Sequence, residues 1–581
     1  MKILLAAINA KYIHSNLAVY CLRAYTLKYL NADIEIAEYT INQQPEEIMR
    51  DIYEKKADML CFSCYIWNLD YVERLVKDIG KICRGLPIWL GGPEVSYDSC
   101  DVLRRLPEVK GVIKGEGEIT FFEIVKAYLE TADGFCEPLD QRLARTKGIT
   151  YRNIFGQSQE GEVVENPWRA PMDLSLVPFV YEDMQEFEHK IIYYETSRGC
   201  PFLCSYCLSS IDKKLRFRSL ELVKKELQFF IDHKVPQVKF VDRTFNCSHE
   251  HAMTVWSYIA EHDNGVTNFH FEVSADLLNE EELELIERMR PGLIQLEIGV
   301  QSTNPDTVQE IRRTMNLDRL RESVLRVEAA GNVHQHLDLI AGLPYENMES
   351  FAKSFDDIYA MRPQQLQLGF LKVLKGSYME EQKEKYQLVY QSRPPYEVLS
   401  TKWLSYGDVL RLKGIEEMVE VYYNSRQFEK TMKELCGEYT SAFIMYEKLW
   451  TYYKEQGFHN VQHKRSARYE ILLDFISKWY PQKKEYYREL LIYDYYLREN
   501  AKTRPVFAGD SSLGKEEIRT FYEQEKKERR YLPGYKGYDK NQMRKMTHLE
   551  RFPQLGRTVL FDYMERNPLN QEARTCAVTI L

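Results

Sequence analysis

Short apolar runs alternate with amphipathic stretches over the first 130 residues of the chain. The apolar runs predict strands, and apolar side chains at helical spacing predict helices between them. The predicted strands are 3–8, 33–39, 59–63, 87–90 and 111–114, and the predicted helices are 17–30, 69–83 and 118–129. Strict alternation implies parallel pairing with right-handed crossovers, and therefore a doubly wound α/β sheet. Sheets of this kind bind ligands beyond the carboxyl ends of their strands.

A second series of strand and helix patterns begins near residue 191. Its predicted strands are 191–196, 237–241, 269–273, 293–298, 335–340 and 365–370. Helical patterns follow these strands at 220–233, 250–263, 280–289, 306–311, 317–330 and 348–361. Six such units predict a partial (β/α)6 barrel, whose chemistry should lie at the carboxyl ends of the strands.

A proline-interrupted stretch separates the two series, and a long tail follows the second. In residues 135–190 only 148–152 resembles a strand, and beyond residue 380 the strand pattern fades into a charged, helical one. The predicted parts are an α/β domain over 1–134, a connector over 135–190, a barrel over 191–379 and a mainly α-helical domain over 380–581. The role of the last part stays open.

Composition and the first residues narrow the class of protein. A chain of 581 residues, 44% hydrophobic and 28% charged, is neither disordered nor fibrous and has room for several domains. The opening apolar run 3–8 is too short for a signal peptide or a membrane span. Twelve cysteines without a secretory segment favour a reducing compartment. We therefore expect a cytoplasmic protein without membrane association.

Charge and tyrosine content differ between the two ends of the chain. Residues 1–400 carry 46 basic and 61 acidic side chains, whereas residues 401–581 carry 32 and 26 and hold 19 of the 41 tyrosines. Basic residues mixed with tyrosines, as in 526–531, would suit single-stranded RNA. Tyrosines at helical spacing usually pack in a core instead. We therefore favour a small molecule or a peptide over RNA as the substrate.

Three closely spaced cysteines carry the strongest chemical signal. Cys200, Cys204 and Cys207 follow directly after the first strand of the second series. Three thiolates can hold three irons of a [4Fe–4S] cluster and leave the fourth iron open to a chelating ligand. Zinc would take a fourth protein ligand, and no His or Cys follows at the spacing of a zinc finger. The pattern therefore favours an iron–sulfur cluster.

This C-x3-C-x2-C spacing after a first barrel strand resembles the radical S-adenosylmethionine (SAM) superfamily. Later segments that resemble landmarks of that superfamily are FVDRTF at 240–245, FEVSAD at 271–276, LEIGVQS at 296–302 and IAGLP at 340–344. The resemblance implies that these segments contact SAM, although Asp242 stands where a Gly-Gly-Glu form is commoner. The implied SAM-binding residues are Tyr206, Asp242, Glu272, Ser274, Glu297, Gln301 and Gly342.

The loops of the first series resemble the Rossmann-like cobalamin-binding domain that precedes the barrel in one large radical SAM class. They read NAKYIHSN at 9–16, FSCYIWN at 62–68, GGPEVS at 91–96 and GEGE at 115–118. Small residues in such loops let the backbone approach a bulky corrin. The implied cobalamin-binding residues are Asn9, Tyr12, Ser15, Ser63, Cys64, Tyr65, Gly91, Gly92, Glu94, Gly115 and Glu116.

The pattern that ligates cobalt through histidine is missing from these loops. Cobalamin domains with a lower histidine ligand carry Asp-x-His-x-x-Gly, whereas the only His-x-x-Gly here, 262–265, has Ala260 at the Asp position and lies in the barrel region. His14 lies in a suitable loop but lacks the pattern. We therefore expect base-off cobalamin without a histidine ligand.

The resemblance implies a class B-like radical SAM methyltransferase. In that class one SAM methylates reduced cobalamin, a second gives a 5′-deoxyadenosyl radical, and the methyl group passes to an unactivated carbon of the substrate. Two alternatives stay open. The same cofactors could serve oxidation, cyclisation or rearrangement without methyl transfer, or the chain could be a cobalamin- or redox-responsive binding protein.

The resemblance also implies an electron donor such as a flavodoxin or a ferredoxin. A 5′-deoxyadenosyl radical has to be shielded from solvent, and the tail after residue 380 is the largest segment without an assigned role. We therefore expect this tail to close the catalytic end of the barrel. The sequence leaves the identity of the substrate and the oligomeric state open.

Overall fold

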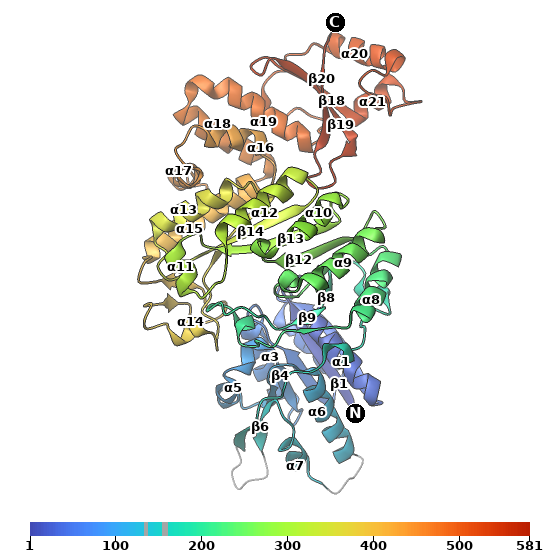
Figure 1. The fold of residues 1–581 in the computed structure, drawn as a ribbon, viewed down its shortest axis with the longest axis vertical. Helices are drawn as coiled ribbons and strands as arrows, with labels where there is room; N and C mark the ends of the chain where they lie inside the picture. Colours follow the sequence, from blue (N-terminus) through green and yellow to red (C-terminus); the bar gives the residue numbers. More distant parts are fainter. Residues whose placement is uncertain (133–136, 154–160, 581) are drawn as a thin grey trace.

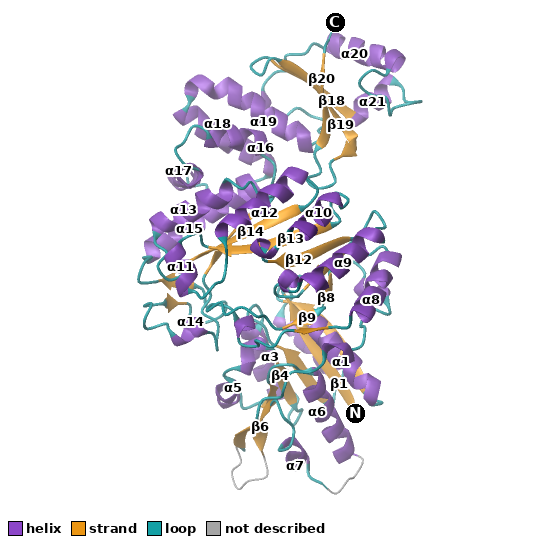
Figure 2. Cartoon of the chain, in the orientation of Figure 1, coloured by secondary structure: helices purple, strands orange, loops and turns teal. Residues whose placement is uncertain are grey.

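The computed structural model describes residues 1–132, 137–153 and 161–580. Its three parts are stacked along the long axis of the molecule (Figure 1). The amino-terminal sheet lies at one end, the second α/β series in the middle and a mainly helical part at the other end, where a small sheet closes the chain (Figure 2). Among the described residues, no helix is both long enough and apolar enough to cross a membrane.

The amino-terminal domain is the predicted doubly wound sheet. Its strands run in the order β2-β1-β3-β4-β5-β6-β7, and the first five pair in parallel. These five strands are β1 (Lys2–Asn9), β2 (Asp33–Thr40), β3 (Met59–Ser63), β4 (Ile88–Gly91) and β5 (Val109–Ile113). The helices between and after them are α1 (Leu17–Tyr29), α2 (Pro45–Glu54), α3 (Leu69–Ile82), α4 (Pro93–Ser96), α5 (Ser99–Arg105) and α6 (Glu118–Ala132).

The central strand of this sheet shows why the apolar runs become parallel strands. Residues 3–8 of β1 are all buried, because helices cover both faces of a doubly wound sheet. Two separate apolar clusters form, one on each face: Ile3 and Leu5 belong to one, and Leu4 and Ala6 to the other. The Rossmann-like fold is thereby confirmed.

Part of the predicted connector belongs to this first sheet. Strands β6 (Ile149–Asn153) and β7 (Glu162–Glu165) extend it in antiparallel fashion beyond β5, and α7 (Leu139–Leu143) precedes them. The sequence predicted a strand only at 148–152. The predicted domain boundary at residue 134 lies outside the described residues. The chain then runs without a long element towards the second series.

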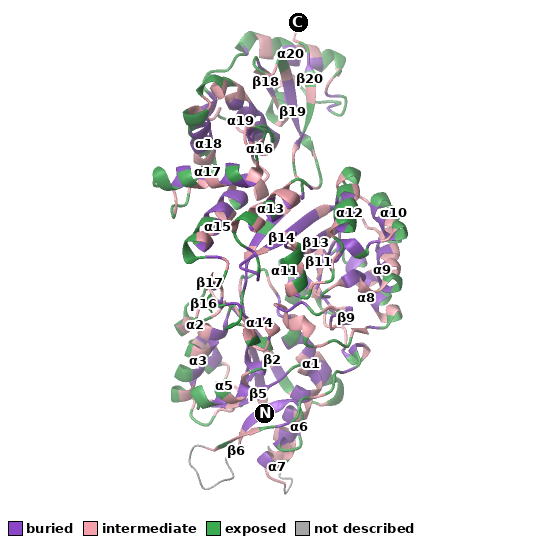
Figure 3. Cartoon of the chain, turned by 60° about the vertical axis from the view of Figure 1, so that its left-hand side comes forward, coloured by how far each residue is buried: buried purple, intermediate pink, exposed green. Residues whose placement is uncertain are grey.

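The second series forms one six-stranded parallel sheet in the order β15-β14-β13-β12-β11-β8. Its strands are β8 (Ile192–Tyr194), β11 (Gln237–Phe240), β12 (Asn268–Val273), β13 (Ile294–Gln301), β14 (His334–Ala341) and β15 (Gln365–Phe370). The helices are α8 (Leu220–Asp232), α9 (His249–Glu261), α10 (Glu280–Arg288), α11 (Pro305–Glu310), α12 (Leu317–Ala330) and α13 (Met348–Tyr359). The strand order follows the chain, as predicted for a partial (β/α)6 barrel. Figure 3 shows buried residues concentrated along these strands.

The carboxyl-terminal part is mainly helical, as predicted, but it ends in a sheet that the sequence did not predict. Its helices are α14 (Tyr378–Glu381), α15 (Tyr406–Val419), α16 (Glu429–Cys436), α17 (Ala442–Glu455), α18 (Arg465–Trp479), α19 (Lys484–Arg498), α20 (Lys515–Glu528) and α21 (Lys540–Met546). Two short strands follow α14, and three antiparallel strands end the chain. They are β16 (Val389–Tyr390), β17 (Val398–Ser400), β18 (Thr547–Phe552), β19 (Arg557–Arg566) and β20 (Ala573–Val578).

Many tyrosines of the tail are core residues. Tyr487, Tyr493 and Tyr496 of α19 are all buried, and the Phe561 ring packs against both Tyr493 and Tyr496. These buried rings have no free face for stacking with a nucleic-acid base. The packing interpretation of the tyrosine-rich pattern therefore applies to α19.

The helical module does not close the catalytic end of the barrel, which corrects the expectation from sequence. Asn424 contacts Leu366 at the amino end of β15, and the hydroxyl of Tyr423 donates to Pro363 O just before that strand. The backbone N–H of Phe443 donates to Asp356 in α13. These contacts place residues 423–443 of the helical module at the amino ends of the strands.

A shorter segment, residues 371–404, lies at the carboxyl ends instead. The N–H of Met379 in α14 donates to Ser205 O, inside the three-cysteine loop, at 2.9 Å. Lys375 lies 2.8 Å from Asp98 of the first domain. This segment therefore joins the cysteine loop to the amino-terminal domain, and it occupies the position that the whole tail was expected to take.

The contact between Asn424 and β15 gives a first prediction. Its amide accepts from the N–H and donates to the C=O of Leu366, both at 2.9 Å, so it pairs the edge of the sheet as a further strand would. Asn424→Ala leaves both backbone groups unpaired. We expect a loss of about 2–3 kcal/mol in the free energy of unfolding, measured by urea denaturation.

A matched control is Asn541→Ala on the exposed start of α21, which should change the free energy of unfolding by less than about 0.5 kcal/mol. Equal unfolding midpoints for Asn424→Ala and the unmodified protein would show that the helical module does not stabilise the barrel edge.

Candidate functional site

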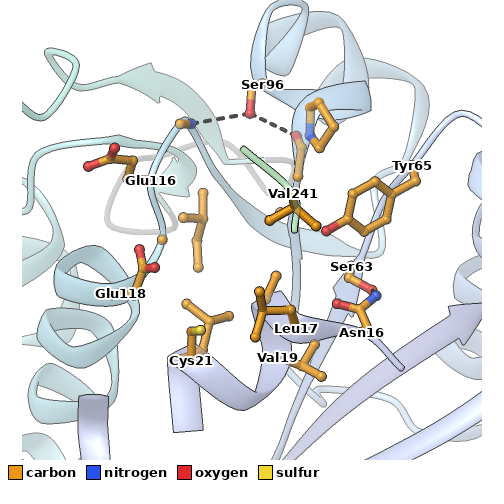
Figure 4. A pocket seen from close by; sticks show the side chains of 18 of the residues that line it. Asn16, Leu17, Val19, Cys21, Ser63, Tyr65, Ser96, Glu116, Glu118 and Val241 are labelled. Carbon is orange, nitrogen blue, oxygen red and sulfur yellow. Dashed lines mark hydrogen bonds between the residues drawn. The ribbon is translucent and has the colours of Figure 1, made fainter. Parts of the chain in front are cut away.

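The carboxyl ends of the two parallel sheets face each other across a cavity of about 700 Å³. The loops after β1, β3, β4 and β5 line one side of it, and residues after β8 and β11 line the other. We call it the interdomain cavity. Figure 4 shows Asn16, Ser63, Tyr65 and Ser96 on the side of the first domain, with Val241 of the barrel beside them.

Glycines let the loops of the first domain approach one another at this cavity. Gly92 has φ +115°, and a Cβ at this position would lie 2.4 Å from Cys64 O. The N–H of Gly115 donates to Ser96 Oγ at 3.2 Å, and this hydroxyl donates to Gly92 O at 2.8 Å (Figure 4). The loops after β4 and β5 are thereby tied together at the wall of the cavity.

The structure brings most of the residues predicted to bind cobalamin to this cavity. The lining includes Asn9, Ser15, Ser63, Tyr65, Gly91, Gly92, Gly115 and Glu116. The other three lie elsewhere. Tyr12 is exposed, Cys64 is fully buried behind Gly92, and Glu94 is buried beside Lys375, 3.7 Å away.

An ion-pair network crosses the interface between the two domains. Arg198 of β9 (Ser197–Arg198) contacts Glu118 at 2.5 Å and Glu195 at 2.9 Å, and Arg216 contacts Glu116 at 2.6 Å. Burial opposes ionisation of Glu118, but the Arg198 guanidinium outweighs it and holds the pKa of Glu118 below its usual value. The network fixes the floor of the cavity to both domains.

A smaller cavity of about 190 Å³ holds the three cysteines, and we call it the cysteine cavity. Cys200 and Cys204 are buried and Cys207 is partly exposed, and none of them forms a disulfide in the described structure. Burial raises the pKa of the Cys200 thiol. The Ser205 N–H donates to Ile311 O at 2.9 Å, so the loop is fastened to the fourth strand-helix unit of the barrel.

Arg313 is a site residue that the sequence reading did not identify. Its guanidinium lies 3.2 Å from the Tyr206 hydroxyl and 3.8 Å from Cys204 Sγ, and it donates to Gly299 O. Burial raises the pKa of Tyr206, so its phenol stays protonated beside this cation. No signal in a single sequence separates Arg313 from its neighbour Arg312, which stacks on Tyr378 outside the cavity lining.

Five of the seven residues predicted to bind SAM line the cysteine cavity: Tyr206, Glu272, Ser274, Glu297 and Gln301. Burial raises the pKa of Glu272 to about 7. Burial also disfavours the charge of Glu297, but His270 and Lys239 outweigh it and lower the pKa of Glu297 to about 2. The cavity thus holds one carboxylate that is fixed by its partners and one carboxyl that can exchange a proton near neutral pH.

Asp242 and Gly342 are the two predicted residues that do not line either cavity. Asp242 points back into the barrel, where it accepts from the N–H and hydroxyl of Thr196 and from the hydroxyl of Ser197. Gly342 has φ +93° and packs against Val398 of β17. A Cβ at position 342 would lie 2.7 Å from Val398 Cγ1. Arg243, the residue after Asp242 in the strand-end segment 240–245, faces both cavities.

Below the cysteine cavity, polar side chains continue along the inner face of the sheet. Ligand atoms of Glu297, His336 and Asp338 all lie within 4.8 Å of one another. His336 lies 3.0 Å from Asp338, and Lys239 lies 3.1 Å from Glu297. Because each carboxylate already has a basic partner, this cluster balances its own charge.

Comparison with known proteins agrees with this geometry. Residues 3–125 match the B12 binding domain, residues 194–358 match the radical SAM superfamily, and residues 384–571 match a protein family of unknown function, DUF4080. The arrangement therefore defines a radical SAM barrel preceded by a cobalamin-binding domain. The chain therefore combines a cobalamin-binding domain and a radical SAM domain with a DUF4080 module in its carboxyl-terminal part.

Named relatives are distant in sequence. The chain is 24% identical over 343 residues to the cobalamin-dependent radical SAM methyltransferase TokK of Streptomyces tokunonensis, covering 56% of this chain and 48% of TokK. It is 23% identical over 265 residues to the anaerobic magnesium-protoporphyrin IX monomethyl ester cyclase of Synechocystis, covering 44% and 49%. The chain thus spans about half the length of these curated relatives.

Solved structures support the same fold. The cobalamin-dependent SAM radical enzyme OxsB, with aqua-cobalamin and SAM bound, aligns with a TM-score of 0.56 at 15% identity over 84% of this chain and 78% of OxsB. TsrM from Kitasatospora setae, a radical SAM methyltransferase with cobalamin and a [4Fe–4S] cluster bound, aligns with a TM-score of 0.54 at 16% identity over 68% and 76%.

The three hydrogen bonds of Asp242 generate a second prediction. Asp242→Ala leaves the Thr196 N–H without a partner just before the cysteine loop, and we expect it to lower the free energy of unfolding by about 2–4 kcal/mol and to reduce iron content. Asp242→Asn keeps an acceptor for the N–H, so its free energy of unfolding and its iron content should fall by less. Iron assay after anaerobic reconstitution and urea unfolding measure both effects.

The pH dependence distinguishes charge from shape at this position. Burial raises the pKa of Asp242 to about 6, above the unfolded value of 3.8, so its contribution to stability is present at low pH and is lost as pH rises through 6. The free energy of unfolding of Asp242→Asn should therefore rise relative to that of the unmodified protein between pH 4.5 and 7.5. An unchanged difference over this range would contradict the assignment.

Proposed function

We propose that the chain is a cobalamin-dependent radical SAM methyltransferase that transfers a methyl group to an unactivated carbon. The observation that carries the proposal is the meeting of the two cavities. Ser209 and Arg243 line both the interdomain cavity and the cysteine cavity, so a ligand in one lies directly beside a ligand in the other. Methyl transfer from cobalt to a substrate radical requires this proximity.

The residues at the cysteine cavity fit an iron–sulfur cluster with bound SAM. Three thiols meet at one end, no fourth His or Cys lines the cavity in the described chain, and Arg313 provides a cation next to Cys204 for a carboxylate. A cluster bound there would supply the electron that cleaves SAM. Glu272, Ser274, Glu297 and Gln301 then have hydrogen-bonding groups for the polar parts of SAM.

Two features of the interdomain cavity support a corrin as its ligand. Its volume is within the range of about 300–1,000 Å³ that is typical of ligand pockets, and its glycine-rich loops leave backbone exposed to a ligand. A cobalamin bound there would supply a methyl carrier. The Arg198 network and the segment 371–404 would keep water from the space between the two ligands.

We also propose that this cobalamin is base-off and has no histidine ligand. His14 is the one histidine among the described residues that line the interdomain cavity. Its Nδ1 lies 2.6 Å from the Tyr193 hydroxyl, and burial lowers the pKa of its ring. The hydrogen bond holds the ring against β8, which supports a role in joining the two domains.

A second candidate is radical chemistry without methyl transfer. It has support from the similarity to magnesium-protoporphyrin IX monomethyl ester cyclases, which are cyclases by name. For either reaction we propose a small molecule or a peptide as the substrate and a flavodoxin or ferredoxin as the electron donor. Because the cluster has to be reduced to work, we propose a reducing compartment such as the cytoplasm.

The cluster assignment is tested by replacing all three cysteines. Cys200→Ala, Cys204→Ala and Cys207→Ala together should remove about four iron and four sulfide per chain and abolish 5′-deoxyadenosine formation from SAM. Iron and sulfide assays, visible absorption and chromatography of the products measure this. S-adenosylhomocysteine formation then separates methyl transfer from the second candidate.

A matched control is Cys436→Ala in α16, far from the site in the chain, which should keep full iron content. A triple variant that retains its cluster would overturn the site assignment. An intact protein that forms 5′-deoxyadenosine with its substrate but no S-adenosylhomocysteine would overturn methyl transfer.

The cobalamin state is tested by electron paramagnetic resonance of the Co(II) form. We expect a spectrum without nitrogen superhyperfine splitting, because no imidazole binds the lower face of cobalt. His14→Ala should leave this spectrum unchanged. A nitrogen triplet that disappears in His14→Ala would show that His14 is a cobalt ligand after all.

A further inference from the structure

One charged side chain faces both cavities and has no partner. Arg243 follows β11 and lines the interdomain cavity as well as the cysteine cavity. Over residues 1–132, 137–153 and 161–580, its guanidinium makes no hydrogen bond and no ion pair. Arg243 is exposed, so the five donors of its guanidinium are open to solvent and to a ligand.

The other charged side chains of the interdomain cavity already have partners in contact. Each acidic residue of its lining contacts Arg198 or Arg216; these residues are Glu116, Glu118, Glu195 and Asp212. Arg243 is therefore the one charged side chain among the described lining residues that has no counter-charge in contact. Arg243 is thus the cation of this acid-rich lining that stays open to an anion.

The charge of Arg243 acts on both sides of the junction. Burial raises the pKa of Tyr65, in the first domain, and the pKa of Glu272, in the cysteine cavity, and Arg243 opposes the rise at each of them. Glu272 forms no ion pair with Arg243 within 4.0 Å and makes no hydrogen bond to it. The guanidinium thus lies between the two cavities and stays free.

Residues other than Arg243 are available to bind the cofactors. Arg313, 3.8 Å from Cys204 Sγ, is the cation next to the cysteine thiols, whereas Arg243 stands at the opening towards the first domain. The space at this opening is where a molecule must lie to contact ligands of both cavities. A methyl acceptor is such a molecule under the proposed function.

We propose that Arg243 binds an anionic group of the methyl acceptor, a carboxylate or a phosphate, and so selects an acidic substrate. The inference rests on the proposed function and specifies its substrate class. The planar guanidinium can hold either group by two parallel hydrogen bonds, which fixes the orientation of the acceptor as well as its position. Arg243 is a specificity-determining residue in this assignment.

The test uses the full chain reconstituted with cluster and cobalamin, supplied with SAM and a reductant. The probes are two fractions of one metabolite extract, separated by their retention on a strong anion exchanger. We expect the retained fraction to stimulate 5′-deoxyadenosine formation at least 10-fold more than the unretained one. Phosphatase treatment of the retained fraction separates the sources, because stimulation is lost for a phosphate ester and kept for a carboxylate.

Variants connect this preference to Arg243. Arg243→Gln should bind the same iron and cobalamin but require more than 10-fold more of the retained fraction for half-maximal stimulation, and Arg243→Lys should recover part of this loss. Arg50→Gln, on the exposed face of α2, should behave as the unmodified protein. Stimulation is read from 5′-deoxyadenosine, so the result does not depend on methyl transfer.

The inference is overturned if the unretained fraction alone stimulates the protein, if the retained fraction has no effect, or if Arg243→Gln shows the same concentration dependence as the unmodified protein. Loss of cobalamin or iron from Arg243→Gln would also overturn it, because Arg243 would then bind a cofactor. Stimulated 5′-deoxyadenosine without S-adenosylhomocysteine would overturn methyl transfer and leave the role of Arg243 supported.

Discussion

Arg198 occupies the largely buried point where the two α/β domains meet, and the interface that forms the interdomain cavity depends on it. Its guanidinium contacts Glu118 at the start of α6 and Glu195 after β8, so a single side chain joins the carboxyl ends of the two sheets. Burial disfavours its charge, but these two carboxylates outweigh burial and raise its pKa. Removing Arg198 would leave the buried Glu118 carboxylate without its partner, and such a loss costs about 3–5 kcal/mol.

This contact explains why the chemistry is assembled from two domains. Parallel sheets offer their ligand-binding loops at the carboxyl ends of the strands. The chain places two such ends opposite each other, and neither cavity is complete without residues near the interface. Ser209, in the cysteine loop, and Arg243, after β11, belong to both cavities. The site is thus a property of the interface rather than of either fold alone.

Sequence patterns predicted the elements that carry a regular local signal. They failed for elements whose structure depends on pairing with distant segments. The strand over 59–63 coincides with β3, and the helix over 317–330 coincides with α12, because an apolar run and a regular helical spacing are both local signals. The strand β19 reads RTVLFDYMER, where charged ends and the acidic Asp562 within the buried run conceal the strand in a tail of helical pattern. Its place is set by pairing with β18 and β20.

The same division holds at the site. The cysteine spacing is local, so its residues were predicted directly. Asp242 and Arg243 differ by one position at a strand end, and which of them faces the cavity depends on how the segment leaves β11, which the sequence does not specify. Arg313 approaches Cys204 only because the loop after β13 folds back over the barrel end.

A partial barrel has two open edges, and an unpaired strand edge is a template for pairing with another chain. Here a different domain contacts each edge of the barrel sheet. The residue before β8, Ile191, forms a bridge with His14 of the first domain, and β15 is capped by the side-chain amide of Asn424. The flanking domains therefore protect the barrel from self-association, and a barrel separated from them would expose both edges to aggregation.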